Sequence, residues 1–149
     1  SGFSVEHEAG RVLKVVIDTS VLVAAILSKN PASAPAKILE NWKAGRFTLV
    51  ISPQMMAELV IVLLRRGVSE ADVEDLIEAM ALIALQISGA YEATILDDID
   101  PDANKFIAAA YESNAGYIVS VDTDLLNLKH SHGTQIVNPG LFLKYLQQS

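Results

Sequence analysis

The chain has 149 residues, of which 51% are hydrophobic and 19% charged, and its formal net charge is -7 at pH 7. This composition excludes a disordered chain and supplies one well-packed core. The negative charge disfavours a protein that coats nucleic acid with a basic surface. The sequence contains no cysteine, which excludes disulfides, thiolate zinc sites and a cysteine nucleophile.

The same sequence gives expectations about domains and location. No internal repeat or linker divides the chain, so we expect a flexible segment over residues 1–10 and a single domain over 11–149. No apolar run is long enough to cross a membrane, and the polar, acidic start is unlike a signal peptide. We therefore expect a cytoplasmic protein that does not contact a membrane.

Short β-type runs alternate with longer helical runs along the chain. Residues 12–17 (VLKVVI) are nearly all apolar and β-branched, which predicts a strand buried on both faces. Capping residues, Pro and Gly then predict the following order: helices over 19–28 and 33–45, a strand over 47–51, helices over 52–66 and 69–85, a short strand within 86–96, a helix over 100–116, a strand over 117–121, a short helix over 125–128, a strand over 135–137 and a helix over 138–146.

Strands joined by helical crossovers predict an α/β fold with a mostly parallel sheet, whose sites lie at the carboxyl ends of the strands. Asp18 follows the first strand and Asp122 follows the strand over 117–121, with Asp124 two residues further on. Each of these Asp residues is also a good helix N-cap. Two acids at two strand ends favour a site over two separate caps.

Glu58 lies in a helix that reads PQMMAELVIVLLRR, among apolar neighbours. A carboxylate is costly to bury there unless it is paired or binds a cation. The alternative is a Glu at the helix edge that pairs with Arg65 or Arg66.

The segment DDIDPDANKF adds four acids at the start of another helix: Asp97, Asp98, Asp100 and Asp102. Asp100 is placed to cap that helix, and Asp102 is an acid in its first turn. The same geometry directs these side chains toward the carboxyl edge of the sheet. Converging carboxylates repel one another unless a cation lies between them, and an all-oxygen ligand set selects magnesium or manganese. Such an ion can activate water at a phosphodiester.

Other signals are weaker. Thr19 and Ser20 can orient a phosphate or a metal-bound water, although helix capping explains them equally well. His130 and His132 are expected in a solvated loop. Nucleotide-binding glycine motifs and a nucleophile elbow are absent from the sequence. The basic residues available for phosphate contacts are Lys37, Lys43, Arg46, Arg65, Arg66 and Lys129.

Three segments together resemble the PIN domain family, most closely its bacterial toxin–antitoxin branch of the VapC type: VVIDTSVLVAAIL, SPQMMAELVIVL and DPDANKFIAAAYESNAGYIVSVDTDLL. The resemblance implies a three-layer α/β/α fold, a magnesium- or manganese-dependent ribonuclease, homodimers and an antitoxin partner. It places the family's first, second and fourth acids at Asp18, Glu58 and Asp122, and a further acid at Asp124.

The sequence departs from the family pattern at the third acid. Members commonly read D-P-D-D-N-K-F, and the position of the second Asp of the D-D pair is Ala103 here. Asp102 or Asp100 can take over the role after a small shift. The leading hypothesis is therefore a metal-dependent endoribonuclease with Asp18, Glu58 and Asp122 as catalytic residues and Asp18, Asp102, Asp122 and Asp124 as metal ligands. The alternative is a non-catalytic PIN-like binding module with a degenerate metal site.

Two expectations follow for single residues. The side chain at position 103 should face the metal site, because it lies in the first turn after Pro101. The substitution Asp18→Asn should preserve or raise the stability of the metal-free protein, because it removes one of several repelling carboxylates.

Overall fold

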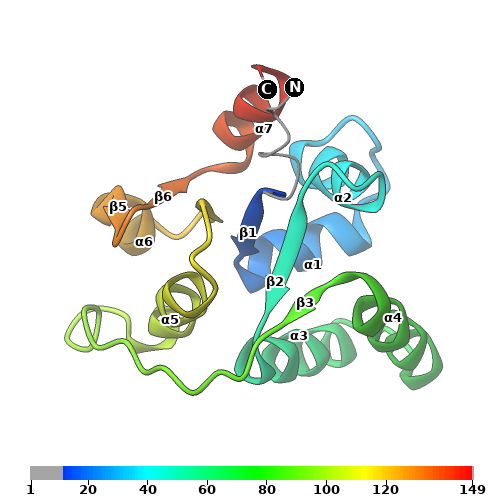
Figure 1. Ribbon diagram of the computed structural model, residues 1–149. Helices are drawn as coiled ribbons and strands as arrows, with labels where there is room; N and C mark the ends of the chain where they lie inside the picture. Colours follow the sequence, from blue (N-terminus) through cyan, green and yellow to red (C-terminus); the bar gives the residue numbers. More distant parts are fainter. Residues whose placement is uncertain (1–11, 149) are drawn as a thin grey trace.

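The computed structural model describes residues 12–148 of the protein (Figure 1). The segment 1–10, which was expected to be flexible, lies outside the described residues.

A six-stranded sheet with the strand order β3-β2-β1-β4-β6-β5 forms the centre of the fold. All neighbouring strands are parallel except β5 and β6, which are antiparallel. The mostly parallel sheet expected from the alternation of elements is thereby confirmed. The strands are β1 (Lys14–Ile17), β2 (Thr48–Ile51), β3 (Leu85–Gln86), β4 (Tyr117–Val119), β5 (His130–Ser131) and β6 (Thr134–Val137).

Helices cover both faces of this sheet, so the three-layer α/β/α architecture is confirmed. Figure 1 shows α1 and α2 on one side of the central strands and α5, which packs against β1, β2 and β4, on the other. The helices are α1 (Thr19–Leu27), α2 (Ala34–Lys43), α3 (Pro53–Arg65), α4 (Glu70–Ile83), the 3-10 turn η1 (Pro101–Ala103), α5 (Asn104–Ser113), α6 (Thr123–Leu128) and α7 (Pro139–Gln148).

The helix starts are set by the capping residues that the sequence shows. The Ser33, Ser52 and Ser69 side chains each accept a hydrogen bond from the backbone N–H three residues further on, at 3.1–3.3 Å. Asp18 and Asp122 cap α1 and α6, and accept from the backbone N–H groups three and two residues further on, respectively. These caps satisfy backbone donors that the first helical turn leaves without a partner.

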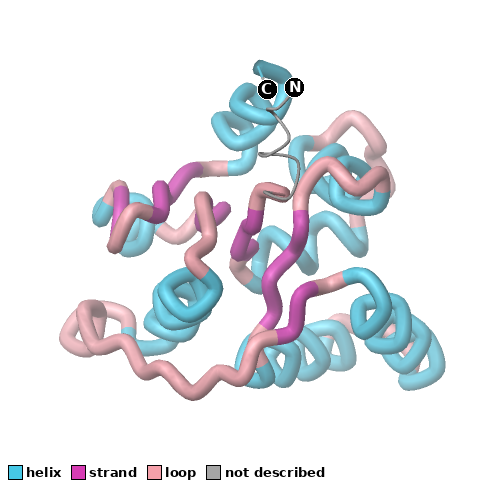
Figure 2. The backbone as a smooth tube through the Cα atoms, in the orientation of Figure 1, coloured by secondary structure: helices cyan, strands magenta, loops and turns pink. Residues whose placement is uncertain are grey.

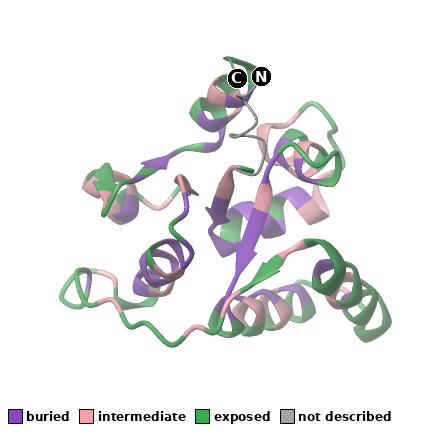
Figure 3. Ribbon diagram, in the orientation of Figure 1, coloured by how far each residue is buried: buried purple, intermediate pink, exposed green. Residues whose placement is uncertain are grey.

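The core lies on both faces of the two central strands. Figure 3 shows β1 and β2 buried together with parts of the helices that face them. Val15, Val16, Leu49 and Val50 have no exposed surface. Burial on both faces explains why these strands read as continuous apolar runs rather than as alternating ones.

Three boundaries differ from the expectation. The helix expected over 69–85 ends at Ile83, because Leu85 and Gln86 pair with β2 at its open edge and form β3. The expected loop around His130 contains β5, which pairs with β6. The strand expected over 117–121 ends at Val119. In each case pairing or turning against the rest of the fold overrides local propensity.

A long loop over residues 87–100 joins β3 to η1 and runs along one side of α5 (Figure 2). Asn104, at the start of α5, holds the end of this loop: its Oδ1 accepts a hydrogen bond from the Leu96 backbone N–H at 3.0 Å, and its Nδ2 donates to Asp97 Oδ1 at 2.7 Å. The loop therefore brings Asp100 to the carboxyl edge of the sheet in a fixed position. Among the described residues, none of the helices is long and apolar enough to cross a membrane.

Candidate metal centre

A depression of about 180 Å³ lies at the carboxyl edge of the sheet, where β1 and β4 end. Asp18, Glu58 and Asp122, the three residues expected to converge there, all line it, although they come from three different elements. The full lining consists of Asp18, Thr19, Ser20, Glu58, Asp100, Asp102, Ala103, Lys105, Phe106 and Asp122.

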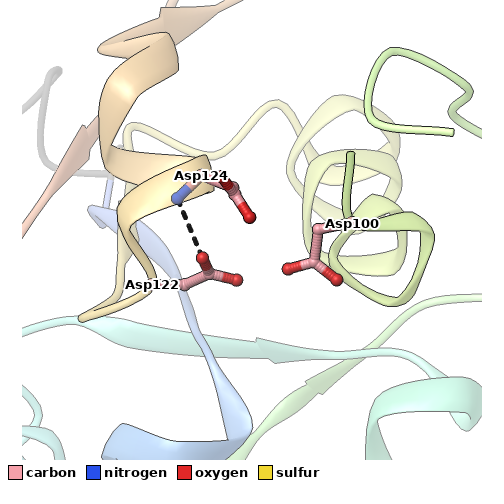
Figure 4. Close-up of side chains that lie close together, drawn as sticks. All are labelled: Asp100, Asp122 and Asp124. Carbon is pink, nitrogen blue, oxygen red and sulfur yellow. Dashed lines mark hydrogen bonds between the residues drawn. The ribbon is translucent and has the colours of Figure 1, made fainter. Parts of the chain in front are cut away.

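Three carboxyl groups at one end of the depression form the densest cluster of acids. Each of Asp100, Asp122 and Asp124 offers a carboxylate oxygen, and these oxygens lie within 4.8 Å of one another. Figure 4 shows the three side chains pointing toward a common space, with Asp100 coming from the start of η1 and the other two from the start of α6. Asp122 Oδ1 also accepts a hydrogen bond from the Asp124 backbone N–H at 2.9 Å.

Asp100 occupies the N-cap position of η1 but does not cap it. Its backbone has φ -152° and ψ 78°, and its side chain accepts no capping hydrogen bond. A hydrogen bond with the Asp122 carboxyl group, followed by desolvation and the nearby charges of Asp122, Asp124 and Asp102, raises the pKa of Asp100 to about 6. Asp100 therefore keeps its proton through mildly acidic pH in the metal-free protein.

Asp18 is a buried carboxylate, and only 4% of the residue is exposed. Its Oδ1 accepts hydrogen bonds from the Val21 backbone N–H at 2.9 Å and from Ser20 Oγ at 3.1 Å. Its Oδ2 accepts hydrogen bonds from Ser120 Oγ and from the Val121 backbone N–H. Four donors match the four lone-pair positions of a carboxylate, which explains how the charge is buried at the end of a central strand.

Ser120 connects this buried carboxylate to the cluster of three acids. The residue is fully buried, and its hydroxyl donates to Asp18 and accepts from the Asp122 backbone N–H at 2.9 Å. A short polar bridge therefore fixes the position of Asp122 relative to Asp18.

Glu58 lies at the other end of the depression, half-buried. Its Oε1 accepts a hydrogen bond from Thr19 Oγ1 and pairs with Lys105 Nζ at 3.3 Å. The alternative pairing with Arg65 or Arg66 is wrong, because the cation comes from α5 rather than from the end of the same helix.

The structure changes the expectation for Asp102. This side chain is exposed in the first turn of η1 and lines the rim, whereas Asp100 joins Asp122 and Asp124. The physical reason is that Asp100 precedes the helical turn with a non-helical backbone, and its side chain, which makes no capping hydrogen bond, points toward Asp122 and Asp124. Ala103 is buried and lines the depression, as expected for this position.

Two contributors to the site were not expected from the sequence, Ser120 and Lys105, whereas Asp100 had been expected only as an alternative to Asp102 for the third acid. The serine interrupts the apolar run YIVSV, and the lysine follows the acid-rich segment directly in DPDANKF, so both carried a signal. None of the six basic residues considered for phosphate contacts lines the depression; Lys105 does.

The donor chemistry of the cluster fits a hard divalent cation. Asp100, Asp122 and Asp124 provide oxygen ligands only, from side chains that are partly exposed and therefore reachable by an ion from solvent. Magnesium and manganese prefer such carboxylate sets and retain waters at their other positions.

Comparisons with known proteins identify the family. A family model described as "PIN domain" matches residues 14–124, and the chain therefore belongs to the PIN domain family. An uncharacterized protein of Methanocaldococcus jannaschii is 30% identical over 122 residues, which cover 78% of this chain and 76% of that protein. The crystal structure of VapBC2 from Rickettsia felis, bound to a DNA fragment from its promoter, contains a similar fold. That match has a TM-score of 0.59 at 16% identity and covers 85% of this chain and 98% of the other.

The hydrogen bonds of Asp18 reverse the expectation for Asp18→Asn in the metal-free protein. The amide nitrogen of Asn would face the Ser120 hydroxyl or one of the two backbone N–H groups, so that at least one buried donor loses its acceptor. We expect the free energy of unfolding to fall by about 1–3 kcal/mol in chelator, as measured by urea denaturation. Asp98→Asn removes the same charge from an exposed side chain and should leave stability unchanged. Equal stability of wild type and Asp18→Asn would show that repulsion, not hydrogen bonding, governs this carboxylate.

The raised pKa of Asp100 predicts a pH-dependent effect of Asp100→Asn. Because the folded protein holds this proton more tightly than the unfolded chain, the wild type loses stability as the pH rises from about 4 to about 6. The Asn variant lacks this loss. Thermal melts in chelator should therefore show its advantage growing over that interval and staying constant above it. An advantage that does not change with pH would contradict the assignment.

Proposed function

We propose that the protein is a PIN-type endoribonuclease that hydrolyses RNA phosphodiesters with a magnesium or manganese ion. One observation carries the proposal: Asp100, Asp122 and Asp124 present oxygens within 4.8 Å of one another at the sheet edge where Asp18 and Glu58 also lie. Carboxylates that lie this close together repel one another unless a cation lies between them, so a purely structural role for the cluster would be unfavourable. The family match supports nuclease chemistry over other uses of such a site.

The residues of the depression have distinct proposed roles. Asp100, Asp122 and Asp124, together with Asp18, hold the ion, which when bound supplies Lewis acidity for phosphodiester hydrolysis. Ser120 positions Asp122 relative to Asp18. Ser20 lies at the rim, where its hydroxyl can turn from Asp18 toward a phosphate oxygen.

Glu58, Thr19 and Lys105 form the second part of the proposed catalytic arrangement. Lys105 carries the positive charge that lines the depression, so a phosphate of RNA competes with Glu58 for it. Release from Lys105 leaves the Glu58 carboxylate available to accept a proton from the attacking water, while Thr19 keeps it oriented.

We further propose that the protein is the toxin of a toxin–antitoxin pair, acts in the cytoplasm and forms a homodimer. The similarity of its fold to a VapBC2 chain favours this branch. Large exposed apolar side chains on and beside α3 and α4 supply surface for a protein partner: Ile61, Leu64, Leu82, Ile83 and Leu85. Exposed apolar side chains that gather on one region of a surface are typical of interaction sites.

The alternative is a non-catalytic PIN-like binding module. Two observations favour it: Asp18 already has four hydrogen-bond donors, and Ala103 leaves one wall of the depression without an acid. In that case the acids would serve the fold or a protein contact.

Metal-dependent RNA cleavage separates these functions. Wild-type protein should cleave single-stranded RNA with manganese or magnesium and should stop when chelator is added. Asp122→Asn should lower the cleavage rate by about 100-fold or more. The substitution removes a ligand and so weakens ion binding, and a bound ion stabilises the transition state by several kcal/mol. Asp98→Asn, an equal charge change on an exposed neighbour, should remain active. Absence of cleavage by folded wild type under all metal conditions would support the binding module.

Ala103→Asp tests whether the missing acid limits ion binding. Because the Ala103 side chain lines the depression, a carboxylate there adds an oxygen ligand, and manganese should bind more tightly in calorimetric titration. Ala103→Asn has the same size without the charge and should gain less. Equal affinities of wild type and Ala103→Asp would show that Asp100 already fills the role of the third acid.

A further inference from the structure

A second, larger hollow of about 370 Å³ lies beside the acidic depression. Its walls are the start of α3, the loop over residues 87–100 and one side of α5. Lys105 lines both the hollow and the depression, so the two adjoin at this side chain. A polymer whose phosphate lies at the acids can therefore reach the hollow with an adjacent group.

The loop that forms the outer wall is fixed by side chains from both neighbouring helices. Glu112 of α5 accepts hydrogen bonds from the backbone N–H groups of Ser88 and Gly89 at 2.9 and 3.0 Å, and Gln54 of α3 donates to the Gly89 carbonyl at 2.8 Å. Gly89 has φ +72°, and a Cβ there would lie 2.3 Å from Gln54 Oε1. The wall is therefore built in advance rather than formed around a ligand, which lowers the cost of binding.

The lining of the hollow suits a flat aromatic group. Ala93, Ala108 and Ala109 are small side chains that leave space, and Tyr91 adds an aromatic ring. Tyr91 packs against Tyr111 in a tilted arrangement, with a centroid separation of 4.3 Å and an interplanar angle of 31°, which holds its ring in place. On surfaces that bind single-stranded nucleic acid, unpaired bases usually stack on aromatic rings.

The polar groups of the hollow select among bases. Asp97 Oδ1 accepts a hydrogen bond from Asn104, whereas Oδ2 has no donor among residues 12–148. The Ser52 residue is 97% buried, and its hydroxyl accepts from Met55 but has no acceptor within the described chain. The hollow thus offers a carboxylate acceptor and a hydroxyl donor, and its acidic lining disfavours a phosphate.

We propose that this hollow binds one unpaired guanine of an RNA strand whose neighbouring phosphate lies at the acidic depression. The inference rests on the proposed function, which makes RNA the ligand. Guanine presents two adjacent donors, N1–H and N2–H, which match a single carboxylate, and an O6 acceptor that matches a hydroxyl. Adenine, cytosine and uracil each lack one of these two adjacent donors.

Binding of fluorescein-labelled pentaribonucleotides in chelator, followed by fluorescence anisotropy, tests the proposal without cleavage. UUGUU should bind at least about fivefold more tightly than UUAUU, UUCUU and UUUUU, the discrimination expected of one bidentate base contact. Asp97→Asn keeps an oxygen that accepts from Asn104 but puts an amide NH2 group in place of Oδ2. The variant should therefore lose the preference for UUGUU. Asp98→Asn changes the same charge on the next residue, which does not line the hollow, and should retain it.

If Asp97→Asn does not fold, a second variant tests whether RNA binds in the hollow. Ala108→Leu fills the hollow from α5 and should reduce UUGUU binding to the level of UUUUU, with folding checked by thermal melting. The proposal is overturned if the wild-type protein binds all four pentaribonucleotides with equal affinity. It is also overturned if the hollow binds N-acetylarginine amide but shows no base preference, because the hollow would then serve a protein partner.

The two hypotheses fail separately. A protein that prefers UUGUU but shows no metal-dependent cleavage overturns the proposed nuclease and leaves the guanine site in place. A protein that cleaves RNA with metal but binds all four pentanucleotides equally overturns the guanine site alone.

Discussion

The buried charge of Asp18 is the constraint on which the arrangement of the site depends. An ionised carboxylate at the end of a central strand is stable only with a full set of donors. The first turn of α1 supplies two of them, and the chain after β4 supplies the other two. Satisfying Asp18 therefore fixes where β4 turns and, through Ser120, where Asp122 lies.

The other acids are arranged in the opposite way. Asp100, Asp122 and Asp124 face one another with few donors around them, so at mildly acidic pH a proton on Asp100, whose pKa is raised to about 6, relieves their mutual repulsion. One edge of the sheet thus holds a fully hydrogen-bonded carboxylate beside a cluster of three carboxyl groups that share one exchangeable proton. The fold tolerates the second group because its members are partly exposed, where water screens their charges.

Local patterns in the sequence predicted most of the fold, because the capping serines, the apolar strands and the Gly and Pro residues act over a few residues. The positions of the acids after β1 and β4 also followed from the sequence, because parallel strands bring their carboxyl ends to one edge of the sheet. The sequence offered both Asp100 and Asp102 for the third acid, and local patterns did not decide between them. As an Asp before Pro, Asp100 resembles an N-cap, and only the path of the 87–100 loop, fixed by Asn104, turns it toward Asp122 instead. The short strand expected within 86–96 begins at Leu85, because it pairs with the distant strand β2. The two-residue strand β5 was not predicted, because so short a hairpin partner of β6 has no apolar alternation to mark it.

The segment from Asp100 to Lys105 lines both the depression and the second hollow, and it carries an acid at Asp100 although position 103 has none. Asp100 precedes the first helical turn and joins the acid cluster from there. Ala103, within that turn, is a small, buried, apolar residue in the wall of the depression. Lys105, two residues further on, lines both the depression and the second hollow. A single helical start therefore carries both an acid of the proposed ion site and the lysine proposed to bind a phosphate, so a change that shifts its first turn should alter both together.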